Sequence, residues 1–421
     1  MDAKTKQKRV LLLNASHNDE RLLKALKNMG CYVITTGNRP NLPGHRLADE
    51  YVYGDYTDQE AMYQLALEKH VDAVCPCCND FGVITAAYIS EKMGFRGQDD
   101  YETTLTIHNK ARFKAFALQL GEINTPMATA FSQLEEALCW AEQGQYTLPL
   151  IVKPVDLSAG NGIRRADTKE ELVSCIQTAF DRSRIKEIVI EPFIEGTQHG
   201  FCTYLIHQKV VAVCSNNEHS FINPYRVEVD TFPAQQVELV QGDLIRQIER
   251  MAKALSLTDG IFHLQYILHD GKAYILECMR RVLGNLYSIP AEGLGEGFDW
   301  DYWEVRAKCG FDLDDFPTTV SQKGFWAYRA LIARQNGKFQ GIHIPPEMQK
   351  QIYAKRMLQN IGDRITNYLS EPMGFLFFRF DTYQEMMQTM IERYDDIRVL
   401  VEEEKNEFEH KEDETTSIQM N

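Results

Sequence analysis

The sequence GIFHLQYILHDGKAYILECMRR, residues Gly260–Arg281, reads as two strands of alternating character joined by a turn at His269-Asp270-Gly271. Gln265 lies on the first strand and Glu277 on the second. A carboxylate at the end of such a strand, followed by two arginines, can hold a metal ion and an anion side by side.

The length of the turn decides whether these two side chains share a face. A two-residue Asp270-Gly271 turn pairs Gln265 with Leu276 and puts Glu277 on the other face. A three-residue loop, with Gly271 left-handed, places Glu277 opposite His263 and diagonal to Gln265, on the same face. We favour the three-residue loop, because only it lets both polar groups point at one ligand.

Bulk properties exclude several classes of protein. The chain has 421 residues, enough for two or three domains, and its net charge of −15 argues against sequence-independent binding of nucleic acid. No apolar run approaches the roughly 20 residues of a membrane span, and the start, MDAKTKQKRVLLLNAS, reads as a first strand rather than a signal peptide. The ten cysteines have no paired spacing, which favours the cytoplasm, and the group Cys75, Cys77 and Cys78 is expected to be structural.

Residues 9 to 100 alternate strands with helices. Strands are expected at Arg9–Asn14, Cys31–Thr36 and Val71–Cys75, and helices at Asp19–Met29, 57–69 and Phe81–Met93. Such alternation indicates a parallel sheet with helices on both faces. The first strand-to-helix turn, residues 14–18, contains no glycine, so the dinucleotide fingerprint is absent and a nicotinamide-dependent dehydrogenase is disfavoured.

The middle of the chain carries candidate phosphate contacts. Lys110 and Lys114 are one helical turn apart, although alone they read as two solvated lysines. The strand Leu148–Pro154 contains Lys153 and leads into a loop of small residues, whose backbone N–H groups can fold over phosphate oxygens. An ordinary hairpin is an equal alternative for this segment.

Two further segments complete the candidate site. The strand Glu187–Glu191 ends at Pro192, and a hinge there can expose backbone groups to an adenine edge, with a plain strand exit as the alternative. The long polar stretch Ser215–Thr231 reads as a mobile lid or substrate loop.

The order of these features resembles the ATP-grasp superfamily, and most closely the carbamoyl-phosphate-synthetase and biotin-carboxylase-like branch of carboxylate–amine ligases. The order is a helix lysine, a strand lysine with a small-residue loop, the hinge EPFIEG and a hairpin ending Glu-x-x-x-Arg, within about residues 9–310. The resemblance implies an α/β and α+β architecture. It comprises a Rossmann-like pre-ATP-grasp domain (1–105), a two-lobed ATP-grasp domain (106–315, lobes about 125–190 and 191–315), a small C-terminal α+β domain (316–400) and an acidic tail (401–421).

The resemblance also implies a role for each matching residue. The ATP contacts it implies are Lys110 and Lys153 on the phosphates, Ser158, Gly160 and Gly162 over them, Glu191, Phe193 and Ile194 at the adenine, and Gln198 at the ribose. Glu277 and Gln265 match the positions of the Mg²⁺ ligands, where Mn²⁺ is a possible substitute. Arg281 and Lys153 match the catalytic residues. The candidates to bind substrate are Arg281, Arg226 and Asn285, and His263 lies in a segment that could line the same pocket.

The implied reaction joins a small carboxylate or amino acid to an amine, or a related nucleophile, through an acyl phosphate, with release of ADP and phosphate. The implied partners are these small molecules, and a homodimer is left open. Three positions depart from the pattern: one metal position is Gln265, as in some carbamoyl-phosphate-like members, Met279 replaces an Asn that would ligate the metal, and Asn109 replaces an Asp. Gln198 stands where the family usually has a glutamate. Met279 and Gln265 motivate the alternative, a non-catalytic or regulatory nucleotide-binding protein on the same fold.

Overall fold

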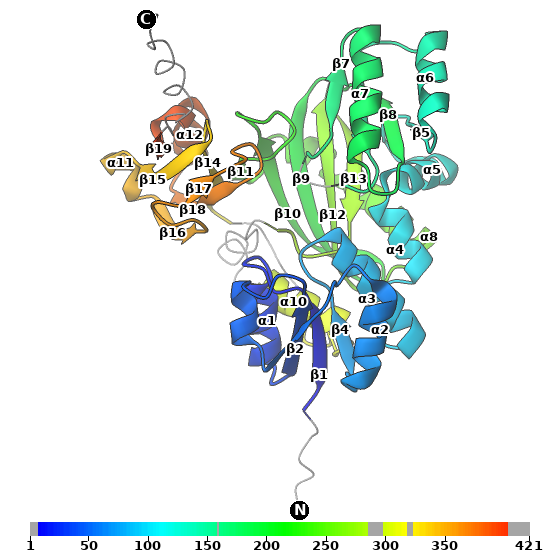
Figure 1. The fold of residues 1–421 in the computed structure, drawn as a ribbon, viewed down its shortest axis with the longest axis vertical. Coiled ribbons are helices and arrows are strands. Elements are labelled where there is room, and N and C mark those ends of the chain that lie inside the picture. Colours follow the sequence, from blue (N-terminus) through cyan, green and yellow to red (C-terminus); the bar gives the residue numbers. More distant parts are fainter. Residues whose placement is uncertain (1–6, 158–159, 285–297, 318–322, 403–421) are drawn as a thin grey trace, which may run out of the picture.

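The computed structural model describes residues 7–157, 160–284, 298–317 and 323–402 (Figure 1). Ser158, Asn285 and nearly all of the expected acidic tail lie outside these ranges. None of the helices within them is both long and apolar enough to cross a membrane.

A parallel four-stranded sheet forms the N-terminal part, at the bottom of Figure 1. Its strands, in the spatial order β3-β2-β1-β4, are β1 (Arg9–Leu13), β2 (Tyr32–Gly37), β3 (Glu50–Tyr53) and β4 (Ala73–Cys75). The helices that follow strands are α1 (Glu20–Asn28), α2 (Gln59–Glu68) and α3 (Asp80–Met93). The short edge strand β3 was not predicted from the sequence, because none of its residues is fully buried and they form no apolar run.

Helices α4 (Tyr101–His108) and α5 (Lys110–Leu120) connect this sheet to a small lobe, at the upper right of Figure 1. The lobe is a four-stranded antiparallel sheet in the order β5-β8-β6-β7, covered by two helices. Its elements are β5 (Thr129–Phe131), α6 (Leu134–Gln143), β6 (Leu150–Pro154), β7 (Arg164–Ala166), α7 (Lys169–Arg182) and β8 (Ile188–Pro192).

An eight-stranded antiparallel sheet runs through the centre of the molecule in the order β13-β12-β9-β10-β11-β14-β18-β16. Its strands are β9 (Thr197–Ile206), β10 (Lys209–His219), β11 (Val229–Phe232), β12 (Gly260–His269), β13 (Lys272–Met279), β14 (Phe325–Ile332), β16 (Ile352–Met357) and β18 (Pro372–Phe380). Helix α8 (Val237–Ala254) packs on an apolar core at one face, and helix α10 (Trp300–Lys308) contributes to the core shared with the N-terminal sheet.

The C-terminal segment continues the central sheet. Strand β14 pairs with β11, so the sheet continues across residue 316, where the C-terminal domain was predicted to begin. That domain boundary stays a prediction. A second, three-stranded sheet in the order β17-β15-β19 packs beside it. The remaining elements are β15 (Gly337–His343), α11 (Pro346–Gln349), β17 (Arg364–Ile365), α12 (Tyr383–Met387) and β19 (Arg398–Glu402).

The prediction of a three-residue hairpin loop was wrong. His269 pairs with Lys272, so the turn is the two-residue Asp270-Gly271, and both residues have positive φ (47° and 72°). Asp-Gly favours this tight turn because both central positions need the left-handed region. Gln265 nevertheless faces Glu277, because a bulge moves the register by one residue.

The bulge is built on the edge strand β13. Tyr266 pairs with Ile275 and Gln265 pairs with Glu277, which leaves Leu276 as the extra residue. The backbone of Ile275 is held from outside the sheet: its N–H donates to the carbonyl of Asn124 (2.7 Å), and its carbonyl accepts from Thr125 Oγ1 (2.8 Å). The chain before the small lobe therefore fixes the register at the bulge.

A buried ion pair ties the end of β13 to the start of α4. Arg280 Nε donates to Asp99 Oδ2 at 2.8 Å, and both side chains are almost fully buried. Burial alone would raise the pKa of the Asp99 carboxyl, but the charges of Arg280 and Lys308 hold this pKa well below its usual range. The pair therefore stabilises the fold above about pH 4, and this contribution is lost as the pH falls below that value.

Replacing Arg280 with Met should lower the free energy of unfolding by about 3–5 kcal/mol, because it leaves a buried carboxylate without its partner. The matched control is Arg112→Met, which removes an exposed pair with Glu102 and should cost less than about 1 kcal/mol. Urea unfolding at pH 7 measures both. Equal losses in the two variants would contradict the assigned role of the buried pair.

Candidate functional site

A row of residues crosses four strands of the central sheet. Asn216 on β10 pairs with Gly200 on β9, Gly200 pairs with Gln265 on β12, and Gln265 pairs with Glu277 on β13. Directly opposed residues share a face, so the four positions form one polar line. Gly200 is required in the middle, because a Cβ there would lie 2.4 Å from Asn216 Oδ1.

A second row lies beside the first, two residues along the strands. Glu218 on β10 pairs with Asp230 on β11 and with Gln198 on β9. Glu218 Oε2 accepts hydrogen bonds from Gln198 Nε2 (2.7 Å) and from Gln265 Nε2 (2.8 Å). Burial, together with the negative charge of Glu277, raises the pKa of Glu218 to about 7.

The first lysine of α5 faces this polar surface. Asn109 caps the helix by accepting from the N–H groups of Ala111 and Arg112, so Asn performs the capping that an Asp would also perform. Lys110, the next residue, reaches Glu277 Oε2 at 3.2 Å and the Leu157 carbonyl at 2.8 Å. It thus joins the second strand of the hairpin to the start of the small-residue loop.

The second lysine of α5 is buried, which corrects the reading of Lys114 as a solvated side chain. Its Nζ donates to Thr125 Oγ1 (2.6 Å) and lies 3.6 Å from Glu191 Oε1. Lys153 of the small lobe approaches the same Glu191 oxygen at 2.9 Å. Burial, opposed in part by the charge of Glu191, lowers the pKa of Lys114 to about 8. Glu191 therefore contributes a carboxylate that balances two buried ammonium groups.

The small-residue loop packs against a loop of the central sheet. Strand β10 ends at His219 and strand β11 begins at Val229, so only residues 220–228 of the predicted lid 215–231 form a loop. A Cβ on Gly160, whose φ is +74°, would meet the carbonyl oxygen of Tyr225 at 2.1 Å. The Tyr225 hydroxyl accepts a hydrogen bond from the Arg165 N–H at 3.0 Å, and Gly162 packs against Pro154.

Other predicted residues lie around this centre. Phe193 lies under the Arg165 guanidinium (4.2 Å), and its N–H donates to the Pro149 carbonyl, so that backbone donor is already used. Ile194 follows it and is partly buried. Arg226 donates to the Leu369 carbonyl at 3.0 Å and so points to the C-terminal segment.

Arg281 contacts the N-terminal part of the molecule through Asp80 and the Cys78 carbonyl. Its Nε and Nη2 contact the two oxygens of Asp80 at 2.8 and 3.3 Å, and the charge of Asp80 overcomes burial to raise the Arg281 pKa. His263 is buried on the face that carries Gln265, and burial followed by the nearby Arg281 charge lowers its pKa to about 3. It is therefore neutral at physiological pH.

Three residues of the centre were missed from the sequence: Glu218, Asp230 and Tyr225. Glu218 lies in the run Ser215–Ser220, where every residue is polar, so the alternation that would mark it as a strand residue is absent. Asp230 and Tyr225 carry no such local signal, because the pairing of distant strands and loops places them.

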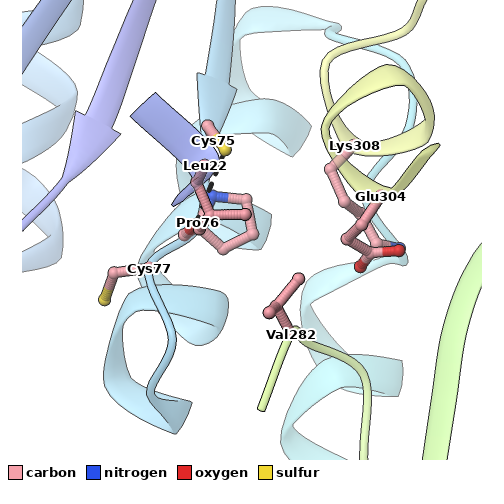
Figure 2. A pocket seen from close by; sticks show the side chains of 7 residues that line it. All are labelled: Leu22, Cys75, Pro76, Cys77, Val282, Glu304 and Lys308. Carbon is pink, nitrogen blue, oxygen red and sulfur yellow. Dashed lines mark hydrogen bonds between the residues drawn. The ribbon is translucent and has the colours of Figure 1, made fainter. Parts of the chain in front are cut away.

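The three neighbouring cysteines lie outside this centre. Cys75, Cys77 and Cys78 are buried, and a hydrogen bond with Cys309 together with burial raises the pKa of the Cys75 thiol. A small pocket lies next to Cys75 and Cys77, and Figure 2 shows Glu304 and Lys308 of α10 on its other side. Within the described ranges, no three His, Cys, Asp or Glu side chains gather as a metal site.

The donor set at the hairpin fits a hard divalent cation that brings its own additional ligands. Glu277 offers a carboxylate. The Nε2 of Gln265 donates a hydrogen bond to Glu218, which leaves the carbonyl oxygen of Gln265 available as a ligand. Mg²⁺ takes oxygen ligands and is commonly held by one or two carboxylates, with water and phosphate completing its shell. Met279 adds no ligand, since its thioether is a poor donor for Mg²⁺.

Replacing Gly160 with Ala should detach the small-residue loop from loop 220–228, because the new Cβ collides with Tyr225. The control is Gly144→Ala, which has a similar positive φ (+66°) but no atom within 4 Å of the new Cβ. Both variants carry about 1 kcal/mol of backbone strain. Only Gly160→Ala should speed hydrogen exchange at the Arg165 amide, and equal exchange in both variants would refute the contact.

Comparison with known proteins agrees with this geometry. Residues 108–224 match the family model described as phosphoribosylglycinamide synthetase, ATP-grasp (A) domain. The carbamoyl phosphate synthase large chain, C-terminal section, of Methanocaldococcus jannaschii is 25% identical over 278 residues, which are 61% of this chain and 42% of that protein. The chain spans about half the length of the sequence relatives it matches.

Solved structures share the fold over nearly all of the chain. The L-amino acid ligase from Bacillus licheniformis has a TM-score of 0.79 at 20% identity and covers 94% of this chain and 99% of its own. The biotin carboxylase domain of the 2-oxoglutarate carboxylase from Hydrogenobacter thermophilus has a TM-score of 0.73 at 19% identity and covers 93% and 90%. The predicted superfamily is confirmed: this chain has the ATP-grasp fold, and its residues 108–224 belong to an ATP-grasp domain.

Proposed function

We propose that this chain is an ATP-dependent ligase that joins a small carboxylate to an amine through an acyl phosphate and releases ADP and phosphate. One observation carries the proposal. Lys110 spans the junction between the two lobes, with its Nζ 3.2 Å from Glu277 of the polar row and 2.8 Å from the carbonyl that begins the small-residue loop. A cation, a carboxylate and the start of the small-residue loop thus converge where a nucleotide polyphosphate would lie.

The charges on the two sides of this junction suit a bound nucleotide. Lys110 can exchange Glu277 for a phosphate oxygen when Glu277 takes the metal, so neither charge is left alone. Lys153 and Lys114 share one buried carboxylate, Glu191, which leaves an excess of positive charge in the small lobe. Phosphate oxygens next to Lys153 would balance that excess.

The metal has a defined place in the proposal. Glu277 and the carbonyl oxygen of Gln265 would hold Mg²⁺, which when bound neutralises phosphate oxygens during phosphoryl transfer. The chain itself positions the reactants and excludes water: Gly160 and Tyr225 bring the two loops together, and Lys110 and Lys153 hold negative charge at fixed points.

The proposed chemistry has two steps. A carboxylate oxygen of the substrate forms a bond to the γ-phosphorus of ATP while the bond to the ADP oxygen breaks. The amine nitrogen then forms a bond to the acyl carbon, phosphate leaves, and the nitrogen loses a proton. The names of an L-amino acid ligase and of a biotin carboxylase crystallised with MgADP and bicarbonate support a carboxylate or bicarbonate as first substrate.

Arg281 remains the predicted anion contact, together with Arg226. Its pairing with Asp80 fixes the guanidinium at the carboxyl end of the N-terminal sheet, so a substrate carboxylate there would share the cation with Asp80. This arrangement supports a substrate position between the N-terminal sheet and the polar row.

A second candidate is a protein on this fold that binds nucleotide without turnover. It is favoured by Met279, which is buried where a metal ligand would lie, and by the single carboxylate that β13 provides. ADP release in a matrix of carboxylates and amines decides between the two. No ADP with any pair, while nucleotide binding persists, would favour the second candidate.

Replacing Glu277 with Gln should reduce ADP formation at least about 100-fold, because the Mg²⁺ that neutralises the phosphates would lose its carboxylate ligand. The matched control is Glu102→Gln, an exposed carboxylate whose loss should leave the rate within about twofold. A coupled ADP assay at saturating Mg²⁺ measures both, after thermal unfolding has shown that each variant is folded. Wild-type turnover in Glu277→Gln would remove the metal assignment.

A further inference from the structure

We propose that Glu218 is a positioning residue that fixes the amide of Gln265, so that its carbonyl oxygen and not its NH₂ group is presented to the Mg²⁺ site. The inference rests on the proposed metal site and concerns a residue that the superfamily resemblance did not mark. It follows from three contacts on one face of the central sheet.

An amide differs from a carboxylate as a metal ligand. A carboxylate presents oxygen to a cation in either orientation, whereas an amide presents oxygen in one orientation and an NH₂ dipole of the wrong sign in the other. Gln265 stands opposite Glu277, so a flipped amide would place its N–H groups beside the metal. A glutamine at this position is therefore useful only if another group holds its nitrogen.

Glu218 meets that requirement. Its Oε2 accepts from Gln265 Nε2 at 2.8 Å, and a carboxylate accepts but does not donate when ionised. The same oxygen accepts from Gln198 Nε2 at 2.7 Å, so one side chain of β10 holds amides on two other strands, β9 and β12. Outer contacts of this kind orient metal ligands and tune affinity.

A second amide on this face, that of Asn216, also donates to a buried carboxyl group, and this pair supplies a control. Asn216 Nδ2 donates to Asp230 Oδ1 at 2.8 Å, and Asp230 pairs with Glu218 across β10 and β11. Asp230 is thus a buried carboxylate of the same polar face, hydrogen-bonded to Asn216. Asp230→Asn alters a buried carboxyl group next to Glu218 on the same face without removing the acceptor of Gln265.

The test measures Mn²⁺ binding by electron paramagnetic resonance in the full chain with a non-hydrolysable ATP analogue. Glu218→Gln should weaken Mn²⁺ at least about 10-fold, the range expected when an outer contact of a metal ligand is lost. Asp230→Asn should change the affinity less than about threefold. Glu218→Asp, which keeps the charge but shortens the reach, should give a loss between the two.

A rescue variant distinguishes loss of the Gln265 amide orientation from a general disturbance of the metal site. In Glu218→Gln/Gln265→Glu the ligand is a carboxylate that needs no orienting partner, so Mn²⁺ affinity should return to within about threefold of wild type. Unchanged affinity in Glu218→Gln, equal losses in Asp230→Asn, or no recovery in the double variant would each overturn the proposal. These measurements need no turnover. The absence of any ligase product would therefore overturn the proposed function alone, and wild-type Mn²⁺ affinity in Glu218→Gln would overturn this inference alone.

Discussion

The register of a single strand pair underlies the whole site. The Asp270-Gly271 turn, taken alone, would put Leu276 opposite Gln265 and turn Glu277 to the other face. One extra residue on β13 reverses this outcome and aligns Glu277 with Gln265, Gly200 and Asn216 across four strands. The bulge is held where Asn124 and Thr125 bind the backbone of Ile275, so the chain that leads into the small lobe also sets the register of the ligand strand.

Ion pairs of charged side chains join helix α5 to the central sheet and to the small lobe. Lys110 contacts Glu277 of the central sheet, while Lys114, only one helical turn later, lies with Glu191 and Lys153 of the small lobe. Helix α5 thereby carries one cation toward each part of the site. Because buried like charges repel unless balanced, this arrangement favours a polyanion between the lobes, which is compatible with the proposed binding of a nucleotide by an acidic chain.

Much of this could be predicted from the sequence, and the exceptions have physical causes. Local patterns gave the strands that carry Gln265, Glu277 and Lys153, because strand alternation and turn chemistry act over a few residues. Gln265 was predicted to share a face with Glu277 through a three-residue turn, whereas the structure has a two-residue turn and a bulge. The bulge could not be predicted locally, because it depends on a hydrogen bond from a segment about 150 residues away. Lys114 looked solvated because its burial depends on Glu191, and Glu218 was missed because its partners are on other strands.

In the proposed metal site, the bulge brings Glu277 beside the oriented amide of Gln265. The most direct measurement is the anomalous diffraction of Mn²⁺ in crystals of the full chain with a non-hydrolysable ATP analogue. We expect a peak about 2.1 Å from both a Glu277 carboxylate oxygen and Gln265 Oε1, a distance typical of such small hard cations. A peak that contacts Glu218 directly, or that touches only the nucleotide, would contradict this expectation.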